Sequence, residues 1–221
     1  MSPPGRPKGE YRSAKHEGTP TSSSRRGFLA GSLALALIGC DRFSPSPNAP
    51  TFFSTDITGA EFARRLELPD TDGKPRTLAD WKGKVTVVFF GYTQCPDVCP
   101  TTMAELATIR KSLGVEGDKL QSVFVTIDPE RDTPEILKAY VANFGPGFTA
   151  LRGTPDQTAA AAKEFKVFYA KVPGRTGGSY TMDHSAASFV FDPAGRVRLY
   201  VPYGGDAKKF AADLKQLLAA G

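Results

Sequence analysis

The sequence predicts an α/β fold with a central mixed sheet, and three observations support this prediction. Two apolar runs, 85–90 and 122–127, have the length and composition of strands that are covered on both faces. A helical pattern follows each run, from Pro100 and from Pro134. The chain then closes with two short strand-like runs and a helical one, which is typical of an antiparallel hairpin packed beside a last helix.

Residues 1–39 have the features of an export signal. The first 24 residues are polar and rich in Pro, Gly and Ser, and Arg25-Arg26 then precede an apolar run from Phe28 to Gly39. That run is shorter than the roughly 20 residues that a membrane-spanning helix needs, so it reads as a signal-peptide core. The paired arginines resemble a twin-arginine signal, although Ala30 stands where such signals often carry Lys.

Cys40 ends a Leu-Ile-Gly-Cys segment that resembles a bacterial lipobox, in which the cysteine is lipidated and becomes the new N-terminus. The alternative is an incidental cysteine at the end of the apolar run. We expect a lipid-anchored protein on the outer face of the bacterial cytoplasmic membrane, which is the periplasmic side in a Gram-negative cell. Asp41 resembles a signal for retention at that membrane.

Residues 40–58 are expected to form a Pro/Ser-rich tether, and residues 59–221 to form one folded domain. Residues 1–39 hold six of the 28 Lys and Arg and two of the 23 Asp and Glu, which leaves 22 basic residues against 21 acidic ones. The predicted domain is thus nearly neutral and lacks the charge of a nucleic-acid-binding surface. We expect a monomer without a nucleic-acid partner.

The elements of the domain can be predicted in order. An Asp-Gly turn at Asp72-Gly73 joins two short strands and predicts an N-terminal hairpin extension. Thr-Pro pairs at 133–134 and 154–155 are typical helix starts, because threonine caps the helix and proline is tolerated at its first position. The other predicted elements are strands at 148–151, 167–172, 187–191 and 196–201, an irregular Gly-rich stretch at 173–179 and a helix at 207–219. This arrangement is thioredoxin-like.

Cys95 and Cys99 lie where the first buried strand gives way to a helix, and His184 is the only histidine beyond residue 39. Cysteines four residues apart can converge on one ion or approach bridging distance. Pro100 disfavours helical geometry at Cys99, so we expect both thiols on an exposed turn, with the helix N-terminus lowering the thiol pKa. The spacing alone leaves a structural disulfide, redox catalysis and metal binding open.

Two thiolates suit Cu(I), and an added imidazole gives a Cys2His set that can also accept Cu(II). Zinc would normally take a fourth protein ligand or an open water position. Asp183 could hydrogen-bond the imidazole of His184 as a weak supporting residue, or it could simply be solvated. We expect Met182 and Met103 to pack in the core, and Trp81 to anchor it.

Three separated segments resemble the Sco/SenC family of copper-binding proteins. They are Gly91-Tyr-Thr-Gln-Cys-Pro-Asp-Val-Cys-Pro-Thr-Thr102, Phe124-Val-Thr-Ile-Asp-Pro-Glu-Arg-Asp-Thr-Pro-Glu135, and Asp183-His-Ser185 with Asp192-Pro-Ala-Gly195. Three motifs in one order are far more specific than a lone CxxxC. The resemblance covers roughly residues 60–221.

The resemblance implies a thioredoxin-like fold and copper ligands at Cys95, Cys99 and His184. It also implies a role in assembling the dinuclear copper site of cytochrome c oxidase, with subunit II or another copper protein as the partner. Some family members donate copper and others reduce the cysteines of that site. We therefore expect a copper chaperone more than an enzyme, with a thiol-disulfide oxidoreductase using Cys95 and Cys99 as the alternative. A peroxide-reducing enzyme of related fold is the third reading.

Overall fold

The computed structural model describes residues 51–174 and 177–220. The export signal at 1–39, the lipidation site Cys40 and the first part of the tether lie outside the described residues, so they stay predictions. Among the described residues, no helix is long and apolar enough to cross a bilayer.

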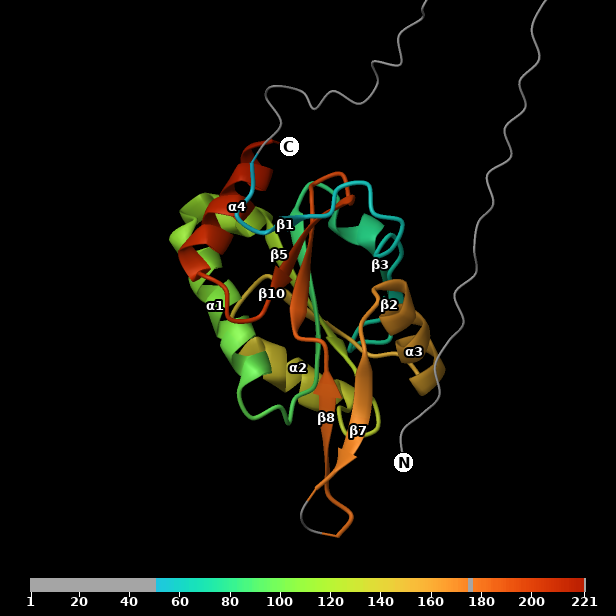
Figure 1. The fold of residues 1–221 in the computed structure, drawn as a ribbon. Coiled ribbons are helices and arrows are strands. Elements are labelled where there is room, and N and C mark those ends of the chain that lie inside the picture. The colour runs from blue at the N-terminus through green and yellow to red at the C-terminus, as the bar shows by residue number, and fades with distance from the viewer. Residues whose placement is uncertain (1–50, 175–176, 221) are drawn as a thin grey trace, which may run out of the picture. The chain divides into compact units, whose positions relative to one another are not determined.

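A six-stranded mixed sheet forms the centre of the domain, in the order β1-β10-β9-β4-β5-β6 (Figure 1). Parallel pairing joins β4 to β5 and β5 to β6, whereas β4 pairs with β9 antiparallel. The strands are β1 Thr55–Asp56, β2 Glu67–Pro69, β3 Pro75–Thr77, β4 Val85–Gly91, β5 Leu120–Thr126, β6 Phe148–Leu151, β7 Tyr169–Pro173, β8 Tyr180–His184, β9 Ala187–Phe191 and β10 Val197–Pro202. The predicted α/β, thioredoxin-like fold with a mixed sheet is confirmed.

Helices cover both faces of this sheet. Side chains alternate between the faces of a strand, so Val87 and Val88 of β4 point to opposite sides. Val87 packs in one core cluster with α1 and α4, and Phe90 on the other side contacts Phe165 at the end of α3 with 5.1 Å between ring centroids. The helices are α1 Val98–Ser112, α2 Pro134–Ala142, α3 Pro155–Glu164 and α4 Ala207–Ala219, with short 3-10 helices at Leu78–Trp81 and Gly114–Lys119.

Most helices and strands lie where the local sequence patterns predicted them. The hydroxyl of Thr133 accepts a hydrogen bond from the backbone N–H of Ile136, and Thr154 caps α3 in the same way. Strands β2 and β3 form the predicted N-terminal hairpin. Trp81, Met103 and Met182 are buried as expected.

The folded domain begins earlier than the predicted boundary at residue 59. Strand β1 pairs with β10 at the edge of the main sheet. Just before it, the backbone N–H groups of Phe53 and Ser54 donate hydrogen bonds to the buried carboxylate of Asp213 on α4. The last residues of the expected tether are therefore fixed to the domain, because a buried carboxylate needs donors and these two amides supply them.

Helix α1 also begins earlier than predicted. It starts at Val98, so Cys99 occupies its second position and Pro100 its third. The first four N–H groups of a helix have no partner within the helix, and a proline there costs no hydrogen bond. The expectation that Pro100 keeps Cys99 out of the helix was therefore wrong.

The stretch before His184 is more regular than the sequence indicated. Residues Tyr169–Pro173 and Tyr180–His184 pair antiparallel and form the hairpin β7–β8, a two-stranded sheet of its own. In Figure 1 this hairpin extends away from the main sheet. His184 is thus the last residue of a strand and does not lie in a long irregular loop.

Candidate metal centre

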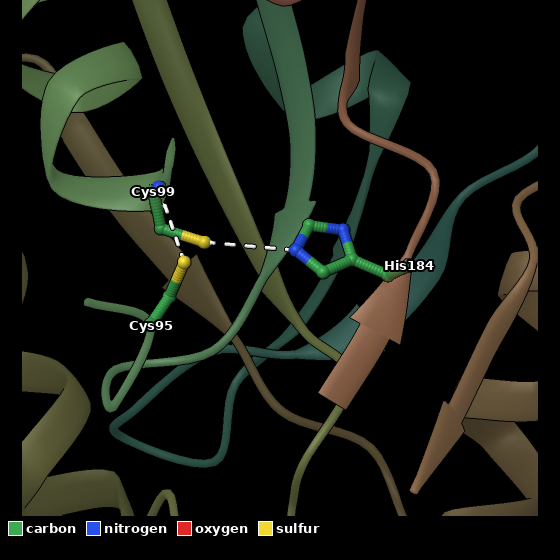
Figure 2. Close-up of side chains that lie close together, drawn as sticks. All are labelled: Cys95, Cys99 and His184. Atoms are coloured by element: carbon green, nitrogen blue, oxygen red, sulfur yellow. Dashed lines mark hydrogen bonds between the residues drawn. The ribbon is translucent and has the colours of Figure 1, made fainter. Parts of the chain in front are cut away.

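Cys95, Cys99 and His184 come together at one end of the domain. Their potential ligand atoms all lie within 4.8 Å of one another. The sulfur of Cys99 is 3.8 Å from Nε2 of His184 (Figure 2). A hydrogen bond connects the two cysteines: the backbone N–H of Cys99 donates to the sulfur of Cys95 at 3.4 Å. Both cysteines are free thiols in this structure.

The two thiols differ in exposure, contrary to the prediction that both are exposed. Cys99 is 0% exposed, whereas Cys95 is partly exposed on the loop before α1. Burial raises the pKa of the Cys99 thiol far above its ordinary value, and the charges of Cys95 and Asp132 add to this, although the backbone N–H of Tyr92 opposes it. Desolvation therefore outweighs the helix N-terminus that was expected to lower the pKa of this thiol.

Gly91 is a residue that the sequence reasoning did not assign to the site. A Cβ atom at this position would lie 2.7 Å from the sulfur of Cys99 and 2.9 Å from ring carbons of Phe89 and Phe124. Real Cβ atoms do not approach other atoms so closely, so the Cys99 sulfur occupies space that only a glycine leaves free. Its position directly before the cysteine loop was the signal for this role.

The ring of His184 is oriented by its backbone and by two aromatic neighbours. Nδ1 lies 3.1 Å from the carbonyl oxygen of Ser185, which can only accept, so Nδ1 carries the proton. This leaves the lone pair on Nε2, the nitrogen that faces Cys99. Phe89 and Tyr92 meet the imidazole edge to face, with 6.4 and 6.0 Å between ring centroids.

Burial lowers the pKa of His184, against the hydrogen bond to Ser185 and the negative charge of Asp183. The neutral imidazole, which is the form that binds metal, is thus favoured near pH 7. Ser185, and not Asp183, provides the hydrogen-bond partner of Nδ1. Asp183 is exposed and influences the ring through its charge, so its supporting role stays a prediction.

A buried carboxylate fixes the loop that carries Cys95. Asp132 accepts hydrogen bonds from the backbone N–H and the hydroxyl of Thr93, and another from the hydroxyl of Thr126 at the end of β5. Burial raises the pKa of Asp132, while these donors oppose the rise. The sequence reasoning placed Asp132 only within a motif, since nothing in the residue pattern shows which loop it would contact.

The donor set fits a soft or borderline metal ion. Two sulfurs and one imidazole nitrogen within 4.8 Å of each other match the ligands that copper takes, and no other Cys, His, Asp or Glu among the described residues joins the group. A structural zinc site would normally add a fourth protein ligand. The arrangement places the three predicted ligand residues together, while Met182 is buried in the core.

Comparisons with known proteins agree with this arrangement. The chain is 34% identical over 157 residues to the mouse (Mus musculus) mitochondrial protein SCO2 homolog, covering 70% of this chain and 62% of that protein. It therefore spans less than two thirds of that relative's length. It resembles the copper-bound structure of ScoI from Bradyrhizobium japonicum, with a TM-score of 0.62 and 39% identity over 69% of this chain and 97% of the other.

A SCO1/SenC family lipoprotein from Bacillus anthracis is also similar in structure, with a TM-score of 0.59 and 26% identity over 72% of this chain and 98% of that chain. The SCO1/SenC family model matches residues 54–219, which include all three candidate ligands and nearly the whole described domain. The chain belongs to the SCO1/SenC family.

Proposed function

We propose that this protein is a copper chaperone that holds Cu(I) or Cu(II) through Cys95, Cys99 and His184. The observation that carries the proposal is the convergence of two thiol sulfurs and one imidazole nitrogen within 4.8 Å. The free Nε2 lone pair and the family membership support it. Copper would be the cargo. The three residues would hold it near the surface of the domain, where Cys95 is partly exposed and a partner could reach it.

The partner in this proposal is a copper protein, with subunit II of cytochrome c oxidase as the expected recipient for its dinuclear copper site. Transfer between proteins requires that the ligands reach the surface, and Cys95 and His184 are both partly exposed. The chaperone acts as a monomer in this account, since one chain supplies all three ligands.

We further propose that lipidation of Cys40 anchors the domain to the outer face of the cytoplasmic membrane. The lipobox-like segment before Cys40 supports this, as does the family lipoprotein from Bacillus anthracis. Mass spectrometry of the mature protein should find the signal removed and Cys40 carrying acyl chains. An unmodified Cys40 in the mature chain would contradict the anchor.

Anaerobic Cu(I) titration against a competing chelator tests the metal site. We expect one Cu(I) per chain and a large loss of affinity in both Cys95→Ser and Cys99→Ser, because each removes a thiolate ligand. In unlipidated protein Cys40→Ser is the matched control, since it removes the third cysteine and should leave the affinity unchanged. Unchanged affinity in the first two variants would contradict the proposal, and an unchanged Cu(II) spectrum in His184→Ala would remove His184 from the site.

The difference in exposure between the two thiols supports a second candidate, a thiol-disulfide reductase. The thiolate of the accessible Cys95 would attack a partner disulfide and release one partner thiolate. Cys99 would then attack the sulfur of Cys95, forming the Cys95–Cys99 disulfide and releasing the second partner thiolate. Reduction of one disulfide of an oxidised subunit II peptide per reduced chain, retained in His184→Ala, would favour this function over copper delivery.

A further inference from the structure

The hairpin β7–β8 brings His184 to the thiols, yet its own strands provide little support. Among the described strands β8 pairs only with β7, and the two form a sheet separate from the main one. Most residues of the hairpin are partly or fully exposed, apart from Met182. A two-stranded hairpin alone is at best marginally stable in water. The position of His184 therefore depends on its link to β9, which begins three residues later, and on contacts between the hairpin and the rest of the domain.

Arg131, in the loop after β5, makes such contacts on three sides. Its Nε donates a hydrogen bond to Oδ2 of Asp128. Its Nη1 donates to the backbone carbonyl of Tyr180 at 2.8 Å, and to Oε1 of Gln94 at 3.1 Å. Tyr180 is the first residue of β8, and Gln94 directly precedes Cys95. One guanidinium group thus joins the strand that ends in His184 to the loop that carries the first thiol.

Tyr180 is held by the same loop through its side chain. The guanidinium carbon of Arg131 lies 3.7 Å from the centroid of the Tyr180 ring, a stacked cation–π arrangement. The hydroxyl of Tyr180 donates to Oδ1 of Asp128 at 2.8 Å. Nη2 of Arg131 is buried and finds no hydrogen-bond partner among the described residues, and the aromatic ring beneath the guanidinium gives this group its favourable contact.

The base of these contacts is rigid. Asp128 is 1% exposed, and its backbone N–H donates to the hydroxyl of Thr126 at the end of β5. Asp128 and Arg131 therefore extend directly from a central strand. A guanidinium has a fixed planar set of donors, so it can serve Asp128, Tyr180 and Gln94 together in one geometry.

We propose that Arg131 is a positioning residue for the metal centre. It stacks on Tyr180 and ties β8 to the cysteine loop, and so it sets the separation between the imidazole of His184 and the two sulfurs. This inference rests on the proposed function for its consequence, because the separation matters when three ligands must meet one ion. The contacts themselves are a property of the metal-free protein and can be tested there.

Hydrogen exchange of the metal-free full chain tests the contacts directly. In Arg131→Gln we expect the amides of β8 to exchange about tenfold faster or more, which is the effect of losing one charge-assisted hydrogen bond. The amides of β4 should be unchanged, and the NMR signals of the His184 ring should move as the ring leaves Phe89 and Tyr92. Wild-type exchange in β8 together with wild-type ring signals would overturn the proposal.

Three further variants separate positioning from general stability. Arg131→Lys keeps the charge but not the planar fork, and should behave like Arg131→Gln. Tyr180→Leu removes the aromatic partner of Arg131 and should loosen β8 in the same way. This variant keeps the test valid if an Arg131 variant folds poorly. Arg198→Gln is the matched control, because Arg198 binds Asp192 away from the site. It should leave the exchange of β8 and the ring signals of His184 unchanged.

The copper-loaded protein provides a separate measurement. The Cu(II) spectrum of Arg131→Gln should shift toward that of His184→Ala, while Cu(I) affinity should change much less than in Cys99→Ser, because both thiolates remain. A Cu(II) spectrum identical to that of the unsubstituted protein would overturn the positioning role. If the unsubstituted protein binds no copper, the proposed function fails, and the exchange measurement still decides whether Arg131 holds the hairpin.

Discussion

Cys99 and His184 face each other across 3.8 Å, but the structures that hold them differ in kind. Cys99 lies on a 15-residue helix packed on the central sheet, and its side chain is fully buried. His184 ends a hairpin outside that sheet, held by side-chain contacts from Arg131 and Tyr92. Cys99 is thus part of the core, whereas we expect that the imidazole side can be loosened without unfolding the domain. A chaperone of the proposed kind would take up and release an ion, and it would need one ligand held firmly and another that can move.

Gly91→Ala should disturb the packing around Cys99 and give the largest loss of stability among these variants. The added methyl group would clash with the sulfur of Cys99 and the rings of Phe89 and Phe124. Overpacking of this kind typically costs about 1–3 kcal/mol, and rigid neighbours place this site toward the upper end. Denaturant unfolding of the metal-free protein measures the loss. Gly177→Ala is the matched control because a Cβ there meets no atom within 4 Å, and an equal loss in both variants would contradict the account.

The proton balance of copper binding should sharpen the comparison. Burial raises the pKa of Cys99, so this thiol is protonated near neutral pH and must lose its proton to bind. Burial lowers the pKa of His184 below its ordinary value of about 6.5. Above that pH the imidazole is already neutral, so it releases no proton when copper binds. Cu(I) affinity should therefore rise with pH, about tenfold per pH unit for each proton displaced.

Two variants, Cys99→Ser and His184→Ala, show which ligand causes this pH dependence of the Cu(I) affinity. From about pH 7 to 8.5, Cys99→Ser should lower the slope of log affinity against pH by about one, and His184→Ala should leave it unchanged. Competition titrations at several pH values give both slopes. A loss of slope in His184→Ala, or none in Cys99→Ser, would contradict this assignment of protons.

The buried part of the molecule is also the part that the sequence predicted best. The apolar runs that became β4 and β5 are hydrophobic on both faces, and such runs have few other places in a fold. The final helix was predicted with its observed bounds because its apolar face repeats with helical spacing. Cys95, Cys99 and His184 were candidates because the domain holds no other cysteine or histidine, and the resemblance to the Sco/SenC family then implied that they bind copper.

Strand β7 was predicted at 167–172, but β8 and its pairing with β7 were missed for a physical reason. The residues of this hairpin alternate little in polarity, since much of β7 and β8 faces solvent on both sides. The burial of Cys99 was missed because Pro100 is a reliable helix boundary signal except in the first turn, where α1 has it. The contacts of Arg131 with residues 94 and 180 join positions far apart in sequence, and no local pattern reveals such pairs.

A smaller loss of stability should follow when a second contact that holds the His184 hairpin, between Tyr92 and Thr181, is removed. The hydroxyl of Tyr92 lies 2.8 Å from that of Thr181 on β8, and removing this hydrogen bond in Tyr92→Phe should cost about 0.5–1.5 kcal/mol of local stability in the hairpin. Hydrogen exchange of β8 measures it. In a cycle with Thr181→Val, the two changes should not add, because they remove the same bond. Strict additivity would show that the pair does not support the hairpin.

Native-state hydrogen exchange of the unsubstituted, metal-free protein tests the contrast between the two sides most directly. We expect the amides of β4 and of the interior of α1, around Met103 and Leu106, to exchange only through global unfolding, since they belong to the buried core. The amides of β8, up to His184, should exchange through a local opening of clearly lower free energy. Equal opening free energies for β4 and β8 would contradict the account, because the imidazole side would then be as firmly built as the thiol side.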